Sequence, residues 1–304
     1  MNQREESVVH RPVMVKEVLE VLAPAQGERF LDLTVGAGGH AFEIAARLGP
    51  GGTLIGMDFD AAVIDIAKKR LEAPGLAACR LYQGNYLDCR DVLAREGLSR
   101  IDGVLADLGL SSLQIADASR GFSFMGDGPL DMRMDSDPGR RTAGDIVNRA
   151  SEAELEETFR EYGEERFARR IARGIVARRQ GGRITNSGEL AEIVRRACGR
   201  YAGGRIHPAT RVFQALRIAV NEELENLSGL LEILPDLLEA GGRVAVISFH
   251  SLEDRLVKDD FRTRARSGAY ERLTKKPLRP SAEEVASNPR SRSARLRAAK
   301  RSEL

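Results

Sequence analysis

The residues best suited to chemistry follow the first apolar segment of the chain. The run Phe30-Leu31-Asp32-Leu33-Thr34-Val35-Gly36-Ala37-Gly38-Gly39-His40 stands where a strand is expected to turn into a helix. Glycine has no Cβ, so it adopts tight-turn dihedrals and lets a ligand lie against the backbone. The helix that follows offers free N–H groups to the same ligand. The run therefore predicts a ligand-binding turn at Gly36, Gly38 and Gly39.

An acidic residue lies about 20 residues beyond these glycines, at the end of the next expected strand. Asp58 ends the segment Gly56-Met57-Asp58, where a carboxylate can accept hydrogen bonds from both hydroxyls of a ribose. The glycine turn and Asp58 together indicate a ligand that contains adenosine. By spacing alone, Gly36, Gly38 and Ala41 also satisfy the nicotinamide-dinucleotide pattern, so a dehydrogenase is an alternative.

Asp32 favours a different adenosine ligand. Its carboxylate lies in the approach to the glycine turn, where it would repel a pyrophosphate but could pair with the α-ammonium group of an amino acid. S-adenosylmethionine has both a ribose and an ammonium group. Asn85 and Tyr86 follow the third expected strand and Asp107 ends the fourth. We expect them at the same edge, because ligands of such sheets bind outside the carboxyl ends of the strands.

Three acidic or basic residues are candidates for the reaction itself. Asp107 either contacts the cofactor or accepts a proton from a reacting amine. His250 and Glu253 follow a later strand segment and are alternative groups facing the substrate. An isolated histidine in such a loop is more often a hydrogen-bonded structural residue.

A basic helix face is the first candidate for the substrate side. Arg166, Arg169, Arg170 and Arg173 recur at three- and four-residue spacing and predict a basic stripe, which either contacts RNA or is a solvated face. The tail, residues 290–301, is a second basic cluster and either a final strand or an arm. Phe122 and Phe124 either stack on an extruded base or anchor the inserted segment.

The elements that must position these residues alternate between strand and helix. Short apolar segments and helix-like stretches alternate over residues 28–105, which is typical of βαβ units around a parallel sheet. We expect strands over residues 29–33, 52–57, 78–83, 101–105 and 244–249. Residues 151–202 predict helices only, opened by a capping box at Ser151 and Glu154, and a long helical stretch covers residues 210–239. The fold is therefore expected to be α/β with an all-helical insertion, in parts 1–112, 113–206 and 207–304.

Composition narrows the class of protein. Lys+Arg 47 against Asp+Glu 45 leaves a net charge of +2 over 304 residues, so attraction to nucleic acid must come from local clusters. Residues 1–12 are polar, and no apolar segment approaches the roughly 18 residues that span a bilayer. Cys79, Cys89 and Cys198 fit neither a disulfide framework nor a zinc site. We expect a soluble cytoplasmic protein without a metal site or a membrane partner.

The chain resembles, over essentially its whole length, the bacterial RsmH family, also called MraW. The resemblance is carried by Asp32-Leu33-Thr34-Val35-Gly36-Ala37-Gly38-Gly39-His40 and by Pro129-Leu130-Asp131-Met132-Arg133-Met134-Asp135. Further matching segments are residues 106–114, 120–124, 207–218, 248–255 and 288–293.

The resemblance implies a class I, Rossmann-like methyltransferase sheet with a helical insertion and S-adenosylmethionine as the cofactor. It also implies methylation of the exocyclic N4 of a cytidine in the decoding region of 16S ribosomal RNA, with the small ribosomal subunit as the partner. Carried over residue by residue, its cofactor contacts fall on Gly38, Gly39, His40, Asp58, Tyr86, Asp107 and Gln114. Asp131, Arg133 and Arg211 lie in matching segments and are expected on the substrate side.

Several functions stay open on the residues alone. They are a methyltransferase for another RNA or DNA base, an NAD-dependent oxidoreductase, and an RNA-binding protein without catalysis. Many amino-methylating enzymes carry a Pro-Pro-aromatic turn after the fourth strand, whereas this chain has Leu108-Gly109-Leu110. The N4 position therefore depends on the resemblance, and both a monomer and a homodimer are compatible with the sequence.

Overall fold

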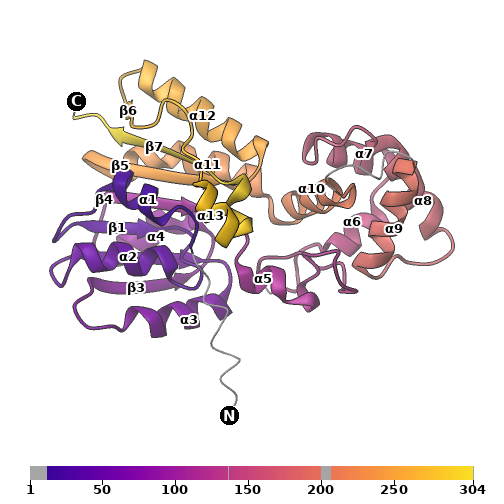
Figure 1. The fold of residues 1–304 in the computed structure, drawn as a ribbon, viewed down its shortest axis with the longest axis horizontal. Helices are drawn as coiled ribbons and strands as arrows, with labels where there is room; N and C mark the ends of the chain where they lie inside the picture. Colours follow the sequence, from indigo (N-terminus) through magenta and orange to yellow (C-terminus); the bar gives the residue numbers. More distant parts are fainter. Residues whose placement is uncertain (1–11, 136, 200–206, 304) are drawn as a thin grey trace, which may run out of the picture. The chain divides into compact units, whose positions relative to one another are not determined.

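The computed structural model describes residues 12–135, 137–199 and 207–303, and the chain divides into two compact units (Figure 1). The sheet unit comprises Met1–Gly109 and Glu225–Leu304, and the insert unit comprises Leu110–Leu224. The insertion end expected at residue 206 and the helix end expected at residue 202 lie outside the described residues. Helix α10 (Ala209–Asn221) falls in the insert unit, because its apolar side chains are part of that unit's core.

The sheet unit is built on a seven-stranded sheet in the order β3-β2-β1-β4-β5-β7-β6. Strands β1 to β5 pair in parallel, and β7 runs antiparallel to both β5 and β6. The strands are β1 (Arg29–Asp32), β2 (Thr53–Asp58), β3 (Ala78–Gln83), β4 (Ile101–Asp107), β5 (Leu238–Ser248), β6 (Tyr270–Arg272) and β7 (Arg295–Arg301). This is the α/β, Rossmann-like class I architecture that was predicted.

Helices cover both faces of the sheet because its strands are apolar on both sides. Phe30 and Leu105 pack with α1 (Val15–Leu22), α2 (Gly39–Leu48) and α3 (Ala61–Leu71). Their strand neighbours Leu31 and Val104 point to the other face and pack with α4 (Cys89–Arg95), α11 (Glu223–Leu237) and α12 (Ser251–Arg266). Among the described helices, none is both long and apolar enough to span a membrane.

The expected strands are confirmed, with differences at their ends. Strand β5 begins at Leu238, earlier than expected. The tail was predicted to be either a strand or an arm, and it is a strand, β7. Strand β6 was not predicted. The single helical stretch expected over residues 210–239 was wrong: it is two helices, because Glu222 takes a left-handed backbone with φ of 51° between α10 and α11.

The insert unit is helical around its own core. Its elements are α5 (Ser112–Ala116), the 3₁₀ turn η2 (Ala118–Arg120), α6 (Ala143–Arg149), α7 (Glu152–Glu161), α8 (Ala168–Arg179), α9 (Ser187–Cys198) and α10. The capping box at Ser151 is confirmed, since Ser151 and Glu154 bond reciprocally at the start of α7. Phe159, Ile171 and Leu190 are fully buried in this core.

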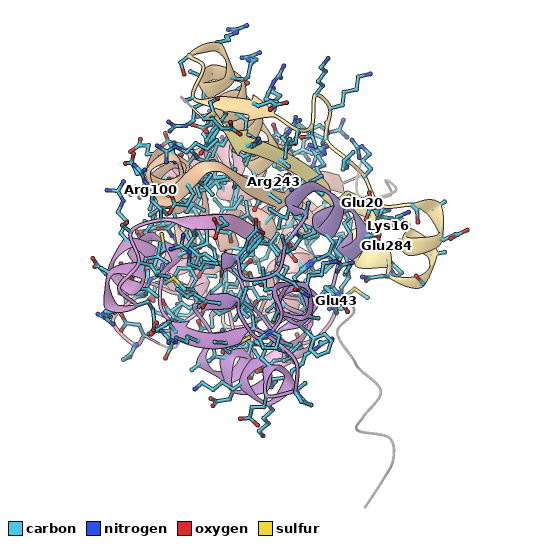
Figure 2. The ribbon with its side chains drawn as sticks, turned by 90° about the vertical axis from the view of Figure 1, so that its left-hand side faces the viewer. Lys16, Glu20, Glu43, Arg100, Arg243 and Glu284 are labelled. Carbon is cyan, nitrogen blue, oxygen red and sulfur yellow. The ribbon has the colours of Figure 1, made fainter. Side chains whose placement is uncertain are left out.

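The last short helix of the sheet unit is tied to the first. In α13 (Ala282–Ser287), Glu284 Oε1 accepts a hydrogen bond of 2.7 Å from the Met14 N–H, just before α1. Figure 2 shows Glu284 beside Lys16 and Glu20 of α1. This bond fixes the chain that leads into β7.

Candidate active site

The glycine turn between β1 and α2 uses a left-handed backbone at two positions. Gly36 has φ of 50°, and Gly38, directly before α2, has φ of 78°. A Cβ on Gly36 would meet only the Thr34 carbonyl oxygen, at 3.9 Å, so this position leaves space for a ligand. At Gly39 a glycine is required by packing instead, because a Cβ there would lie 2.9 Å from the Pro12 ring. The turn is fixed by its backbone and open at Gly36.

Asp58, the last residue of β2, is hydrogen-bonded to this turn. Its Oδ2 accepts from the Gly36 N–H at 2.8 Å and its Oδ1 accepts from the Asp60 N–H at 3.0 Å. Burial raises the pKa of Asp58 to about 6, although these N–H groups oppose the rise. Each oxygen keeps a second lone pair, so the oriented carboxylate can also accept from the hydroxyls of a ligand.

Asp32, the last residue of β1, is only 1% exposed. Its Oδ1 accepts from the Thr34 N–H at 3.1 Å, and its Oδ2 has no hydrogen-bond partner among the described residues. Burial raises the pKa of Asp32 to about 7, and the charges of Asp107 and Asp58 act in the same direction. A buried acceptor without a donor is costly, so this oxygen suits a ligand that brings a cationic donor.

Asp107 ends β4, between β1 and β5 in the sheet. Its N–H donates to Thr34 Oγ1 at 2.6 Å, and its Oδ2 lies 3.7 Å from His40 Nε2 in the first turn of α2. No residue that the structure describes donates to its buried Oδ1. Burial raises the pKa of Asp107 to about 7 although a hydrogen bond from the Gly109 N–H opposes the rise, and the charge of Glu253 adds to it. A pKa near 7 suits a group that accepts a proton during a reaction.

Asn85 and Tyr86 follow β3 at the same edge. The Asn85 side chain accepts from the Leu87 N–H at 2.9 Å and thereby caps the 3₁₀ turn η1 (Tyr86–Asp88). Tyr86 is buried, and its ring meets that of Phe59 edge to face, with 6.0 Å between the centroids. Phe59, directly after Asp58, was not singled out in the sequence. The two rings form an apolar wall of the kind that binds a flat base.

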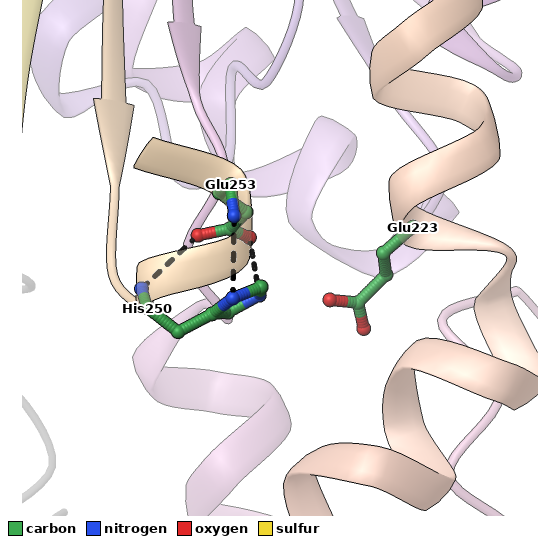
Figure 3. Close-up of side chains that lie close together, drawn as sticks. All are labelled: Glu223, His250 and Glu253. Carbon is green, nitrogen blue, oxygen red and sulfur yellow. Dashed lines mark hydrogen bonds and ion pairs between the residues drawn. The ribbon is translucent and has the colours of Figure 1, made fainter. Parts of the chain in front are cut away.

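His250 and Glu253 lie after β5 and cap α12 (Figure 3). His250 Nδ1 accepts from the Glu253 N–H at 3.4 Å, while Glu253 Oε2 accepts from the Phe249 N–H at 2.8 Å. His250 Nε2 lies 3.1 Å from Glu253 Oε1. This geometry favours the structural interpretation of His250, and Glu253 is the buried charge that acts on Asp107.

The carboxyl edge of β1, β2 and β4 thus gathers three acids around one glycine turn. Thr34 connects Asp32 with Asp107, and Gly36 connects the turn with Asp58. The donor and acceptor set fits S-adenosylmethionine: an acceptor for its ammonium group, a carboxylate for its ribose and negative charge for its sulfonium. It does not fit a pyrophosphate, which these acids would repel.

Three candidate residues of the insert unit have partners inside that unit. Gln114 Oε1 accepts from the Ser111 N–H at 2.9 Å and completes a capping box on α5. Arg133 grips Asp131 with two hydrogen bonds of 2.7 Å, from Nε and Nη2. Burial opposes ionisation of Asp131, but the bonds and charge of Arg133 outweigh it and lower the pKa of Asp131. Both side chains of the Asp131–Arg133 pair are therefore already engaged within the insert.

Phe122 and Phe124 pack against the core of the insert unit. The Phe124 ring stacks on His207 with 4.9 Å between centroids and meets Phe213 edge-on at 5.2 Å. These contacts give both rings a role within the insert's own core. Stacking on an extruded base stays a prediction.

Three arginines of the basic stripe lie on α8, and Arg166 lies in the preceding turn, two residues before the first residue of the helix, Ala168. Arg166, Arg169, Arg170 and Arg173 are all exposed. Arg166 and Arg170 lie over the Phe167 ring at 4.6 and 5.6 Å, and Arg173 Nε is 3.6 Å from Glu152 Oε1. Exposed pairs of this kind are weak, so the stripe keeps its charge at the surface. Arg211, on α10, donates to the Glu164 carbonyl at 3.2 Å.

Two connecting residues were missed in the sequence. Thr34 lies inside the glycine motif, so its position was an available signal for its role in joining Asp32 and Asp107. Asn221 donates to the Met132 carbonyl and accepts from the Met134 N–H, both at 2.8 Å. It thereby holds Met132 at φ of 61°. Asn221 is 87 residues from Met134, and no local pattern indicates this contact.

Comparison with known proteins gives similarity over both units. The family model described as the MraW methylase family matches residues 7–302. A "Ribosomal RNA small subunit methyltransferase H" of Syntrophotalea carbinolica is 48% identical over 308 residues, which cover 96% of this chain and 98% of that protein. A protein of the same name from Pelobacter propionicus is 49% identical over 306 residues, covering 95% and 97%. One from Koribacter versatilis is 47% identical over 304 residues, covering 97% and 95%.

Proposed function

The chain belongs to the MraW methylase family, and from this premise we propose that it transfers a methyl group from S-adenosylmethionine to the exocyclic N4 of a cytidine in the decoding region of 16S ribosomal RNA. The names of its relatives support a substrate in the RNA of the small ribosomal subunit. The resemblance in the sequence supports the cytidine N4. The observation that carries the proposal is the group of acids, Asp32, Asp58 and Asp107, around the glycine turn.

In the proposed complex each of these residues contacts a different part of the cofactor. Asp32 Oδ2 accepts from the ammonium group, Asp58 accepts from the ribose hydroxyls, and Phe59 with Tyr86 flanks the adenine. When bound, S-adenosylmethionine supplies a methyl group on a positively charged sulfur. The raised pKa values of Asp32 and Asp107 are consistent with this fit, because a bound positive charge restores their ionised forms.

Asp107 is the proposed acceptor for the amine. The lone pair of cytosine N4 is delocalised into the ring, so the amine must be held in line and must regain sp³ character. A carboxylate that accepts one N4 proton at Oδ1 favours both changes, and Oδ1 is the oxygen without a donor. Thr34 keeps the Asp107 main chain in place, and His40 Nε2 lies 3.7 Å from Asp107 Oδ2.

The proposed RNA contacts of the insert unit are its exposed cations. The basic stripe presents four exposed arginines, Arg169, Arg170 and Arg173 on α8 and Arg166 in the turn before it, where they can meet phosphates. Phe122 and Phe124 remain candidates for stacking, and the Asp131–Arg133 pair and Arg211 support the fold around them. We place the reaction in the cytoplasm, where ribosomal subunits are assembled.

Family membership excludes the dehydrogenase alternative for the glycine pattern. Methylation of another RNA or DNA base is the remaining competitor. The test is incubation of the protein with methyl-labelled cofactor and small ribosomal subunits that lack the modification, followed by mapping of the modified nucleotide by mass spectrometry. One methyl group on the amine of one decoding-region cytidine is expected. A methyl group on a different base, or none in the presence of bound cofactor, contradicts the proposal.

A further inference from the structure

The tail of the sheet unit contains arginines that the fold itself uses. Arg297 Nε donates to Asp254 Oδ1 at 2.7 Å, and Arg295 Nη1 donates to Asp254 Oδ2 at 3.2 Å. Arg301 donates to the Leu238 carbonyl. These side chains hold β7 against α12 and β5, so they contribute to stability and have little charge to offer to a partner.

Three nearby arginines differ from them. Arg279, Arg290 and Arg292 are exposed, and in the ranges that the structure describes none forms an ion pair or a side-chain hydrogen bond. We call these three residues the C-terminal basic cluster. Of the two acids in α13, Glu284 accepts a hydrogen bond from the Met14 N–H, and Glu283 is exposed and forms no ion pair with the cluster among the described residues. The cluster therefore presents cationic groups without a protein counter-ion.

The backbone beneath the cluster is fixed. Ser291 is fully buried between Arg290 and Arg292 in the 3₁₀ turn η4 (Pro289–Ser293), and its Oγ donates to the Asn288 carbonyl at 2.8 Å. Leu278, directly before Arg279, exchanges hydrogen bonds of 2.9 and 3.0 Å with Leu296 of β7. Because the main chain is already ordered, a ligand of this cluster would order only the side chains.

The topology places the cluster at the edge that carries the acids. Strand β7 runs antiparallel to β5 and begins opposite Ser248, whereas Asp107 at the end of β4 lies opposite Ile247 of β5. With strands about 4.8 Å apart, the start of β7 is roughly 10 Å from the end of β4. In Figure 1, α13, which precedes this start, lies at the edge where β4 and β5 end.

We propose that the C-terminal basic cluster binds RNA phosphates next to the target nucleotide. This inference rests on the proposed function. The acids that suit a cationic cofactor repel the RNA backbone, so a base that enters the site leaves its phosphates outside, where cations must hold them. Arginine suits this role because its guanidinium grips phosphate oxygens in pairs. The sheet unit thus holds the RNA beside the reacting base.

The test compares two triple variants of the full chain. Arg279→Gln, Arg290→Gln and Arg292→Gln remove the cluster, while Lys69→Gln, Arg95→Gln and Arg100→Gln remove three exposed cations that likewise form no ion pair in the described ranges. Arg100, labelled in Figure 2, directly precedes β4 and so lies at the opposite edge of the sheet. The binding of small-subunit ribosomal RNA is measured from 50 to 200 mM salt.

Each lost phosphate contact removes about 0.7 to 0.9 from the slope of log affinity against log salt. Raising the salt from 50 to 200 mM weakens the binding of both proteins. For the cluster variant the factor by which affinity falls should be roughly 20- to 40-fold smaller than for the unmodified protein. The control variant should keep the original slope, and both should melt as the unmodified protein does. An unchanged slope in the cluster variant, or an equal fall in the control, overturns the inference. Failure of the unmodified protein to methylate the RNA would contradict the proposed function, whatever the slopes show.

Discussion

The acids at the ligand edge of the sheet unit and the charged residues of the insert unit differ in whether they have partners within the protein. At the carboxyl edge of the sheet, Asp32 and Asp107 are buried, and one oxygen of each lacks a donor within the described residues. In the insert, Asp131 is gripped twice by Arg133. Asp32 and Asp107 can therefore still bind a ligand, whereas Asp131 is already bound to a partner within the protein.

The pKa directions express the same difference. Burial raises the pKa values of Asp32 and Asp107 to about 7, but the pKa of Asp131 is lowered because Arg133 outweighs its burial. An uncompensated buried carboxylate destabilises a fold and is retained where a ligand compensates for it. In this chain, conspicuous charged motifs are therefore either ligand sites or structural clamps, and a structural clamp is recognised by partners that lie within the fold.

The largest expected effect is at Asp107. Asp107→Asn keeps the shape but replaces one carboxylate oxygen by a donor, so the proton acceptor is lost. Single-turnover methylation of small subunits at saturating cofactor should fall by roughly two to four orders of magnitude. Cofactor affinity, measured by calorimetry, should fall much less. A near-normal rate would show that Asp107 only contacts the cofactor.

The second prediction concerns Asn221, which connects α10 with Met132 and Met134 inside the insert unit. Asn221→Ala leaves the Met132 carbonyl and the Met134 N–H without their partner and frees a left-handed residue. The free energy of unfolding should fall by about 3 kcal/mol, the scale of one buried and one half-buried group left without partners. Thermal denaturation and cofactor binding are measured together. Loss of cofactor affinity in the folded variant would contradict a purely structural role.

The sheet and its ligand edge could be predicted from the sequence because they depend on local patterns. Strand β3 was predicted to the residue, and the glycine turn and Asp58 followed from spacing along the chain. What could not be predicted depends on distant contacts. Asn221 meets Met134 across 87 residues, and the break at Glu222 depends on one left-handed residue that is not glycine. The capping role of His250 required the position of Glu253 in three dimensions.

The third prediction concerns cofactor binding at the sheet edge. Asp58→Ala removes the acceptor for the ribose hydroxyls, so calorimetry should show S-adenosylmethionine binding weakened by about 2 to 3 kcal/mol. Asp65→Ala is the matched control, since Asp65 is an exposed acid on neighbouring α3 paired only with Lys68 in the described contacts. Equal affinities for the two variants would remove Asp58 from the cofactor site.

The fourth prediction concerns the exposed charges of the insert. Replacing Arg166, Arg169, Arg170 and Arg173 by Gln should reduce the salt dependence of RNA binding by about one counterion per lost phosphate contact. Arg195→Gln and Arg196→Gln form the control on α9, because both arginines are paired with Glu192 at 2.6 Å. An unchanged slope in the stripe variant would show that the stripe is a solvated face, and an equal change in the control would show that the effect is not specific to the stripe.

The smallest expected effect is a shift in pH dependence at Glu253. Asp107 faces Asp32 from β1, His40 from α2 and the buried charge of Glu253 from α12. If ionised Asp107 accepts the proton, the methylation rate should fall as the pH drops below the pKa of Asp107, about 7 in the protein without its ligand. Bound cofactor, which is cationic, moves that limb toward lower pH.

Glu253→Gln removes a negative charge beside Asp107 while its amide oxygen can still accept from the Phe249 N–H. Since the charge of Glu253 raises the pKa of Asp107, its removal lowers that pKa, and the acid limb of the pH profile should move to lower pH. Asp259→Asn, which neutralises a half-exposed acid on the same helix, should leave the limb in place. A helix cap alone would change stability and the overall rate, but not the pH at which the rate falls. If the rate of the Glu253→Gln variant falls at the same pH as that of the unmodified protein, the charge of Glu253 does not act on Asp107, and Glu253 is one of the structural clamps.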